Sequence, residues 1–230
     1  LEKSEQRRQE FVANVSHELK TPMTTIGGYI DGMLDGTIPP EKQQHYMQIV
    51  SGEVRRLSRL VRNMLDIAKL QAMGVEESRK TRFDLGEELS DVLITFEQKI
   101  YNKHLDVRVD LPDKPVWTRA ERDSITQVIY NLIENAIKFC PDGGRLSLRV
   151  QSDGGKARVS VENTGPTIDK DELPLLFDRF HKADYSRSMD REGVGLGLYI
   201  VKTILNKLKE NITVTSEDGV TRFTFTLTLA

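Results

Sequence analysis

The sequence contains a single cysteine, Cys140, among its 230 residues. It therefore cannot form an internal disulfide or a cysteine metal cluster, and it suits a reducing compartment. No run approaches the roughly 18 uninterrupted apolar residues that a membrane helix needs, and no charged-then-apolar leader opens the chain. There is no basic excess either, since 33 Lys and Arg stand against 35 Asp and Glu. Proteins that bind duplex nucleic acid usually have a surplus or a stripe of basic residues, and this composition gives no sign of one. We therefore expect no nucleic-acid partner.

The chain has enough length and apolar content, 38% hydrophobic residues, for two modest globular domains. In residues 1–73 the apolar residues recur at steps of three, four and seven, which predicts two long helices, broken near Pro39 and Pro40. Two such helices cannot bury their apolar stripes against each other alone. We therefore expect a second copy to complete a dimeric four-helix bundle, with a plain structural coiled coil as the alternative.

From about residue 83 onward the pattern changes to mixed helix and strand. It predicts helices over 85–103, 121–139 and about 199–208, and strands over 105–109, 146–151, 157–161, 212–215 and 222–229. Interleaved helices and antiparallel pairs favour an α+β sandwich over a doubly wound fold. The predicted organisation is therefore a helical hairpin over 1–73, a linker over 74–82 and an α+β domain over 83–230.

The first segment with chemical potential is SHELKTP, residues 16–22, in the middle of the first predicted helix. His17 falls on the predicted exposed face beside Glu18, and Thr21 lies one turn further on the same side. A carboxylate neighbour can hold the imidazole tautomer and accept a proton while a ring nitrogen attacks an electrophile. An ordinary polar helix surface is the alternative. Pro22 favours a functional role, because a proline inside a helix costs about 3 kcal/mol.

The second segment is NLIENAIKF, residues 131–139, in the predicted helix over 121–139. Asn131 and Asn135 lie one turn apart on its polar face, where amide oxygens can hold a hydrated Mg²⁺ together with substrate phosphates. Lys138 can then meet a phosphate charge. A hydrated helix face is the alternative.

Two further segments carry a weaker phosphate signal. Residues 177–182, FDRFHK, precede a polar run over 183–191 that we expect to form a mobile loop able to close over phosphates. Glycines 193, 195 and 197 open a predicted helix, where backbone amides can approach an anion. No Gly-Lys-Ser or Gly-Lys-Thr follows, which disfavours a P-loop fold, and the glycine spacing does not match a dinucleotide fingerprint.

In this order and spacing, the four segments together resemble the sensor histidine kinases of two-component signalling. That family joins a dimerisation and phosphotransfer hairpin to a GHKL-type ATP-binding domain. The H-box corresponds to residues 11–22, the N-box to 131–139, the F-box to 177–180 and the second glycine box to 193–197.

The resemblance implies a role for each matching residue. His17 would be the phosphoacceptor, Glu18 would assist its attack, and Thr21 would help orient water for dephosphorylating the partner regulator. Asn135 would coordinate Mg²⁺, and Asn131 stands where related ATPases keep a glutamate that activates water. The remaining nucleotide-binding positions implied by the family are Lys138, Phe139, Asn163, Gly165, Arg179, Lys182, Gly193, Gly195 and Gly197.

The segment 161–168, VENTGPTI, departs from the first glycine box of the family. Asn163 replaces an aspartate that accepts from the adenine amino group, and Thr167 replaces the second glycine. A neutral acceptor gives up roughly 1 kcal/mol of charge assistance, so we expect ATP to bind with reduced affinity. A degenerate pocket stays the alternative.

The implied function is ATP- and Mg²⁺-dependent autophosphorylation of His17, transfer to an aspartate of a response regulator receiver domain, and phosphatase activity on that regulator. The partners would be a second copy and the regulator. A pseudokinase or signalling scaffold is the alternative, and a free-standing GHKL ATPase conflicts with Asn131, which is not a general base. We expect the chain as given to be cytoplasmic, with an upstream segment absent here anchoring the full-length protein in the bacterial inner or plasma membrane.

Overall fold

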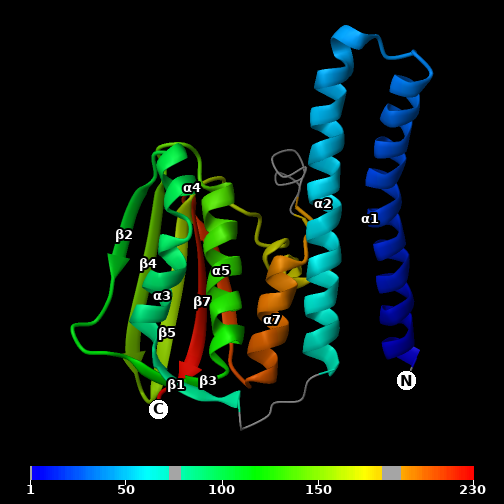
Figure 1. The fold of residues 1–230 in the computed structure, drawn as a ribbon. Helices are drawn as coiled ribbons and strands as arrows, with labels where there is room; N and C mark the ends of the chain where they lie inside the picture. The colour runs from blue at the N-terminus through cyan, green and yellow to red at the C-terminus, as the bar shows by residue number, and fades with distance from the viewer. Residues whose placement is uncertain (1, 73–78, 183–192) are drawn as a thin grey trace.

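The computed structural model describes residues 2–72, 79–182 and 193–230, and shows a long helical hairpin beside a layered α/β domain (Figure 1). The hairpin consists of α1 (Glu2–Leu34) and α2 (Pro40–Ala72), each of 33 residues. The two helices predicted from the apolar spacing are therefore confirmed. None of the described helices is long and apolar enough to cross a membrane. The expected loop over 183–191 lies outside the described residues.

The turn between the helices is closed by short-range bonds. Gly36 adopts a φ of 81°, which favours glycine, and the Thr37 amide donates to the Asp35 side chain at 2.8 Å. Pro40 is the first residue of α2, where its missing N–H removes no helical hydrogen bond. The proline pair thus starts the second helix, as the sequence predicted.

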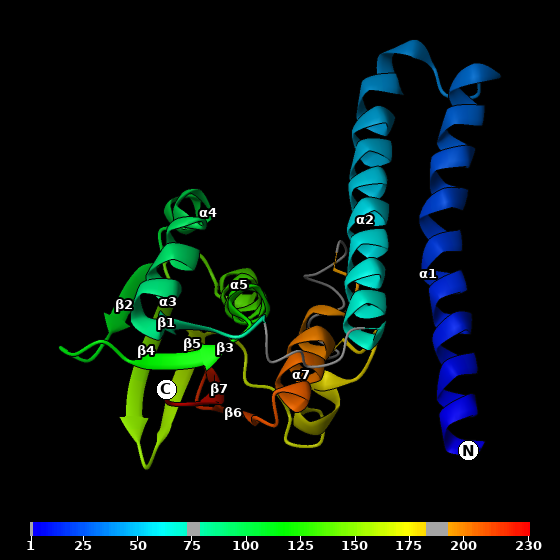
Figure 2. The same ribbon diagram turned by 60° about the horizontal axis from the view of Figure 1, so that its bottom comes forward.

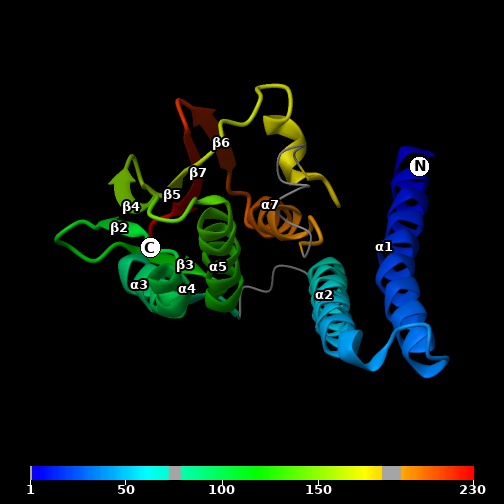
Figure 3. The same ribbon diagram turned by 90° about the horizontal axis from the view of Figure 1, so that it is seen from above.

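A five-stranded sheet forms the base of the α/β domain, in the order β2-β4-β5-β7-β6. Strand β2 pairs in parallel with β4, and every other neighbouring pair is antiparallel. The strands are β2 (Asp106–Asp110), β4 (Arg145–Asp153), β5 (Lys156–Thr164), β6 (Ile212–Glu217) and β7 (Val220–Thr228). Helices α3 (Leu85–Ile94), α5 (Arg122–Phe139) and α7 (Gly197–Lys207) cover one face (Figures 2 and 3). The predicted α+β sandwich is confirmed.

The core lies between this sheet and α5 (Arg122–Phe139), with α7 (Gly197–Lys207) beside it. Along β5 the buried residues alternate, as expected for a strand with one covered face. The apolar face of α5 is fully enclosed, and each such Ile or Leu side chain contributes about 1.5–3 kcal/mol through burial. Its members are Ile125, Val128, Ile129, Leu132, Ile133, Ala136 and Ile137.

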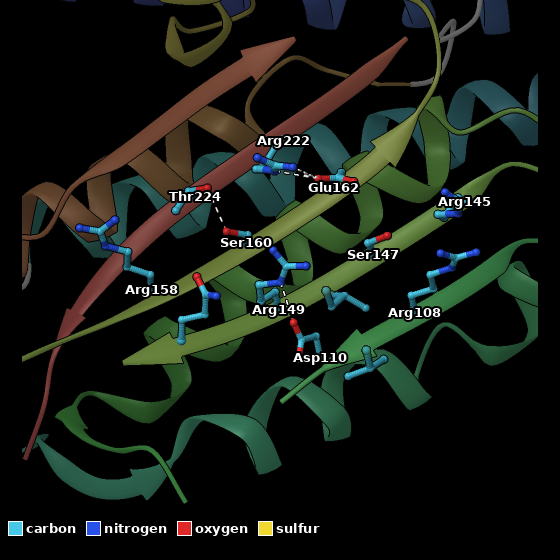
Figure 4. Close-up of a pocket in the computed structure, with 13 residues that line it drawn as sticks. Arg108, Asp110, Arg145, Ser147, Arg149, Arg158, Ser160, Glu162, Arg222 and Thr224 are labelled. Carbon is cyan, nitrogen blue, oxygen red and sulfur yellow. Dashed lines mark hydrogen bonds and ion pairs between the residues drawn. The ribbon is translucent and has the colours of Figure 1, made fainter. Parts of the chain in front are cut away.

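The opposite face of the sheet is polar and carries cross-strand pairs (Figure 4). Arg149 binds Asp110 at 2.8 Å, and the hydroxyls of Ser160 and Thr224 lie 3.0 Å apart. Such pairs stabilise neighbouring strands on a solvated face. Only one face of the sheet is therefore available to build the core.

Two details differ from the sequence prediction. The helix expected over 85–103 is two helices, α3 (Leu85–Ile94) and α4 (Glu97–Asn102), separated where Phe96 inserts into the core. Two strands were not predicted, β1 (Thr81–Asp84) and β3 (Trp117–Ala120), which pair antiparallel. Four-residue strands have too few alternations to show a period. The first residues of β1 fall in the segment expected to be linker.

Helix α2 packs against the α/β domain as well as against α1. Leu60 and Ile67 of α2 are 2% and 1% exposed and belong to the same hydrophobic core as α5 and α7. The Gln127 amide of α5 donates to Asp66 of α2 at 3.2 Å. Part of the apolar stripe of α2 is therefore covered by the α/β domain of the same chain, whereas Val54, Val61 and Leu65 stay exposed.

Glu210, in the turn between α7 and β6, ties this turn to the sheet. Its carboxylate accepts from Lys156 Nζ at 2.8 Å, from Thr226 Oγ1 at 2.7 Å, and from the amide and hydroxyl of Thr228. Burial raises the pKa of Glu210, but these hydrogen bonds outweigh burial and hold the pKa below its usual value. The ionised carboxylate is thus stabilised by the fold.

We expect Glu210→Gln to lower the free energy of unfolding by about 1–2 kcal/mol at neutral pH, because charge-assisted hydrogen bonds are lost. A lowered folded-state pKa contributes stability above the unfolded pKa, and that contribution is lost as pH falls through the folded value. The difference between variant and wild type should therefore shrink in acid. Urea denaturation across a pH series measures it. Glu217→Gln, which alters an exposed carboxylate on β6, is the control and should show no such dependence.

Candidate functional site

His17 lies on α1 with its side chain exposed, as predicted. Its sequence neighbour Glu18 accepts from Arg56 Nη2 of α2 at 2.9 Å, so an ion pair between the two helices holds this carboxylate in place. Thr21 is exposed one turn on, and its hydroxyl donates to the His17 carbonyl at 3.2 Å. Pro22 is buried within α1 and has no N–H to donate to the Glu18 carbonyl four residues earlier.

A cavity of about 1040 Å³ lies where α5, α7 and α2 meet. Polar residues of α5 form one wall, and the glycines that lead into α7 form another. Nine of the predicted nucleotide-binding residues line it: Asn131, Asn135, Lys138, Phe139, Asn163, Lys182, Gly193, Gly195 and Gly197. The tertiary structure therefore gathers residues that are up to 66 positions apart in the sequence, from 131 to 197.

The glycine wall depends on one unusual backbone conformation. Gly195 has a φ of 72°, and a Cβ there would lie 2.8 Å from the His181 carbonyl oxygen. The Gly195 carbonyl also accepts from the Phe180 amide at 2.9 Å. Only glycine allows this close approach of the two chain segments, so the segment that ends at Lys182 is held against the start of α7.

Two polar atoms of the site are buried without a partner. They are Nδ2 of Asn131 and Nε2 of His181, among the residues that the structure describes. Both residues line the cavity. Buried polar groups are nearly always hydrogen-bonded, so these atoms indicate that the cavity suits a polar ligand. Together with the cations Lys138 and Lys182, they fit a nucleotide with charged phosphates.

Asn163 lies deep in the cavity and is 4% exposed. Its Nδ2 donates to the Thr164 carbonyl at 3.0 Å, which leaves the amide oxygen as its acceptor. Thr167, which stands in place of the second glycine, accepts from the Gly219 amide at 2.9 Å. An aspartate at position 163 could not donate the first hydrogen bond, because an ionised carboxylate has no N–H. A glycine at position 167 has no hydroxyl to accept the second.

Two predicted nucleotide-binding residues do not line the cavity. The guanidinium of Arg179 lies between two rings, 4.7 Å from the centre of Phe11 and 4.6 Å from that of Tyr199. Such cation–π contacts attract a guanidinium to the ring faces. Gly165 packs behind the site, where a Cβ would lie 2.8 Å from the Phe139 carbonyl oxygen. Arg179 therefore joins the α/β domain to α1, and Gly165 permits close packing.

Any metal at this site has few protein ligands available. No group of three or more His, Cys, Asp and Glu residues that could hold an ion occurs within 2–72, 79–182 and 193–230. Mg²⁺ commonly keeps several waters and binds through few side chains plus substrate phosphates. The amide oxygen of Asn135 in the cavity wall suits that mode, so the donor set fits Mg²⁺ bound with a nucleotide.

The sequence prediction missed the wall contributed by α2. Arg59, Arg62, Asn63 and Asp66 line the cavity, at spacings of three, four and seven that place them on one helix face. The spacing was visible in the sequence, but nothing there showed that this face meets α5. Lys103 was also missed; its ammonium donates to the carbonyls of Ile137, Lys138 and Cys140 and so caps the end of α5.

Comparison with known proteins identifies the family to which each part of the chain is similar. Residues 7–72 match the His Kinase A (phospho-acceptor) domain, and residues 120–230 match the histidine kinase-, DNA gyrase B- and HSP90-like ATPase family. The sensor histidine kinase WalK of Bacillus subtilis is 33% identical over 230 residues, which cover 98% of this chain and 37% of WalK. The chain thus spans little more than a third of the length of this curated relative.

Solved structures of histidine kinases are similar to this chain over most or all of its length. Histidine kinase AdeS of Acinetobacter baumannii matches with a TM-score of 0.73 and 26% identity, over 93% of this chain and 98% of AdeS. Histidine kinase ThkA, in complex with response regulator protein TrrA, matches with a TM-score of 0.79 and 28% identity, over 100% of this chain and 66% of that one. With a phospho-acceptor hairpin followed by this ATPase domain, the chain belongs to the sensor histidine kinases of two-component systems.

Proposed function

We propose that this chain phosphorylates His17 with ATP and passes the phosphoryl group to an aspartate of a response regulator. The observation that carries the proposal is the cavity, which gathers nine predicted nucleotide-binding residues and two unpartnered polar atoms in the same chain as the exposed His17. Asn131 supports a kinase over a plain ATPase, because an amide cannot deprotonate water as a carboxylate does.

In the first step a ring nitrogen of His17 attacks the γ-phosphorus. The new N–P bond forms as the bond to the oxygen that bridges the β- and γ-phosphates breaks, and ADP leaves with that electron pair. Glu18 orients the ring and accepts the proton of the imidazole. Its ion pair with Arg56 holds it in place for this role. Asn131, Lys138 and Lys182 bind and position the nucleotide, and positioning supplies much of the rate enhancement.

Mg²⁺, when bound at Asn135, would neutralise phosphate charge. Because His17 is not among the residues lining the cavity, the ATPase domain must change its position relative to α1, or meet α1 of a second copy. The exposed apolar residues Val54, Val61 and Leu65 on α2 support a homodimer through the hairpin.

In the second step a carboxylate oxygen of the regulator attacks the phosphorus, the N–P bond breaks, and the imidazole is regenerated. The ThkA structure, which contains a histidine kinase together with a response regulator, supports this class of partner. We further propose that Thr21 orients water for hydrolysis of the regulator's phosphoaspartate. Membrane anchorage of the full-length protein stays a prediction from the family.

A scaffold that does not turn over nucleotide is the second candidate, and Asn163 is the observation that favours it. The amide replaces a carboxylate at a position that is almost fully buried. Calorimetry with Mg²⁺ and a non-hydrolysable ATP analogue distinguishes the two functions. Absence of binding by the wild-type chain would favour the scaffold.

We expect His17→Gln to abolish incorporation of label from [γ-³²P]ATP, because glutamine has no ring nitrogen to attack the phosphorus. The label on the wild-type protein should be acid-labile and base-stable, as phosphoramidates are. His45→Gln, which alters another histidine of the hairpin, is the control and should retain labelling. Equal labelling of wild type and His17→Gln would remove His17 from this role.

We expect Asn135→Ala to weaken binding of the ATP analogue at least tenfold in the presence of Mg²⁺, and much less in EDTA, because the lost amide oxygen acts through the metal. Isothermal titration calorimetry measures both. Asn206→Ala, at an exposed asparagine on α7 outside the cavity, is the matched control. A loss of the same size with and without Mg²⁺ would contradict metal coordination by Asn135.

We expect Thr21→Ala to slow dephosphorylation of the phosphorylated regulator by about tenfold or more while autophosphorylation of His17 continues, because only the hydrolytic step needs an oriented water. Release of phosphate from purified phosphoregulator measures the first activity, and radiolabelling measures the second. Thr24→Ala, at another exposed threonine of α1, serves as the comparison. Parallel loss of both activities would indicate a general defect of the helix.

A further inference from the structure

Two polar helix stripes face each other across the cavity. The α2 stripe consists of Arg59, Arg62, Asn63 and Asp66. The α5 stripe includes Gln127, Asn131 and Asn135, again at steps of four. The hydrogen bond of 3.2 Å between Gln127 and Asp66 joins the two stripes at one end. The hairpin domain thus supplies part of the wall of the proposed nucleotide site.

The same hydrogen bond locates Arg62 relative to α5. Arg62 lies one turn before Asp66 on the same face of α2, and Asn131 lies one turn after Gln127 on the same face of α5. At 1.5 Å per residue, each is about 6 Å along its own helix from the residue that makes the bond. The two helices are not parallel, since Figure 2 shows α5 end-on and α2 along its length. Arg62 and Asn131 thus line the same cavity, each one turn from the point where the helices are joined.

The charge of Arg62 is not balanced within the described part of the chain. Arg62 is exposed to the cavity and has no hydrogen-bond or ion-pair partner among the described residues. By contrast, Arg56 on another face of α2 binds Glu18 and Glu53. Glu134, an acidic residue of α5 that also lines the cavity, is itself paired with Lys99 at 3.1 Å. The wall that α2 contributes to the cavity thus carries a guanidinium with no ion-pair partner among the described residues.

We propose that Arg62, assisted by Arg59, binds the phosphates of the nucleotide held against α5 and α7. The proposal rests on the proposed function, because it assigns a further contact to the same nucleotide. A guanidinium presents a planar set of donors that matches phosphate oxygens. The triphosphate would then bridge the ATPase domain and α2, and the nucleotide would be held by the hairpin as well as by its own domain.

If both α2 and the ATPase domain bind the phosphates, nucleotide binding affects the position of the two domains relative to each other. In the arrangement described, the phosphates would be held toward α2, whereas His17 lies on α1 and outside the cavity. Release of the phosphates by Arg62 would then accompany any movement that presents the γ-phosphate to His17. In this arrangement Arg62 binds the substrate and takes no part in the attack by His17.

The experiment compares affinities of the whole 230-residue chain for two ligands, the Mg²⁺ complex of a non-hydrolysable ATP analogue and adenosine, by isothermal titration calorimetry. The variants are Arg62→Gln, Arg62→Lys, and Arg55→Gln as the matched control. Arg55 is an exposed arginine seven residues earlier on α2 that does not line the cavity. Thermal unfolding by circular dichroism verifies that each variant is folded.

We expect Arg62→Gln to weaken binding of the triphosphate about threefold to tenfold, the range for a charge-assisted contact at a partly exposed site. Adenosine binding should not change. Arg62→Lys should retain part of the affinity, because it keeps the charge without the planar donors. Arg55→Gln should bind both ligands as wild type does.

The outcomes separate the two proposals. If the wild type binds the analogue and Arg62→Gln binds it equally well, or loses no more affinity than Arg55→Gln, Arg62 makes no phosphate contact and the inference is wrong. Equal loss for adenosine and triphosphate would also overturn it, since it would indicate a change in cavity shape. Failure of the wild-type chain to bind either ligand would instead reject the nucleotide site itself.

Discussion

The packing of the two faces of α5 sets both the core of the α/β domain and the wall of the cavity. One face carries seven buried apolar residues that pack on the sheet, and the other carries Asn131, Asn135 and Lys138 toward the cavity. Because side chains at steps of three and four share a face, burying the first set fixes the direction of the second. Rotation of α5 would expose apolar surface and remove the polar wall together. Stability and the proposed nucleotide site are therefore set by the same contacts.

Helix α2 adds a second constraint of the same kind. Leu60 and Ile67 are buried against the α/β domain, so the adjacent polar residues of α2 must meet the cavity. Arg179 makes a further connection between the domains by lying between Phe11 of α1 and Tyr199 of α7. The F-box residue expected at a phosphate thus contacts the hairpin. Together these contacts define a docked arrangement in which α2, and not the segment around His17, forms part of the cavity wall.

Much of this could be predicted from the sequence where the signal is local and periodic. The long helices, the strands that form the pairs β4–β5 and β6–β7, and the order of motifs containing His17, Asn135 and Gly195 all follow from spacing within short windows. The four-residue strands β1 and β3 could not be predicted, because their pairing is decided by a partner over 30 residues away. The break at Phe96 was missed for a similar reason, since burial in a distant core overrides a continuous helical pattern.

The exposed imidazole, the amide pair and the glycine segment can be recognised in the sequence, because each depends on neighbours within one or two helical turns. Which of these residues come together depends on how the helices and the sheet pack. Nine predicted residues line one cavity, whereas Arg179 and Gly165 do not. Arg62, which was not predicted, lines the cavity from the hairpin. Which face of a helix meets which neighbouring element depends on burial between residues far apart in the sequence, and a local pattern does not contain that information.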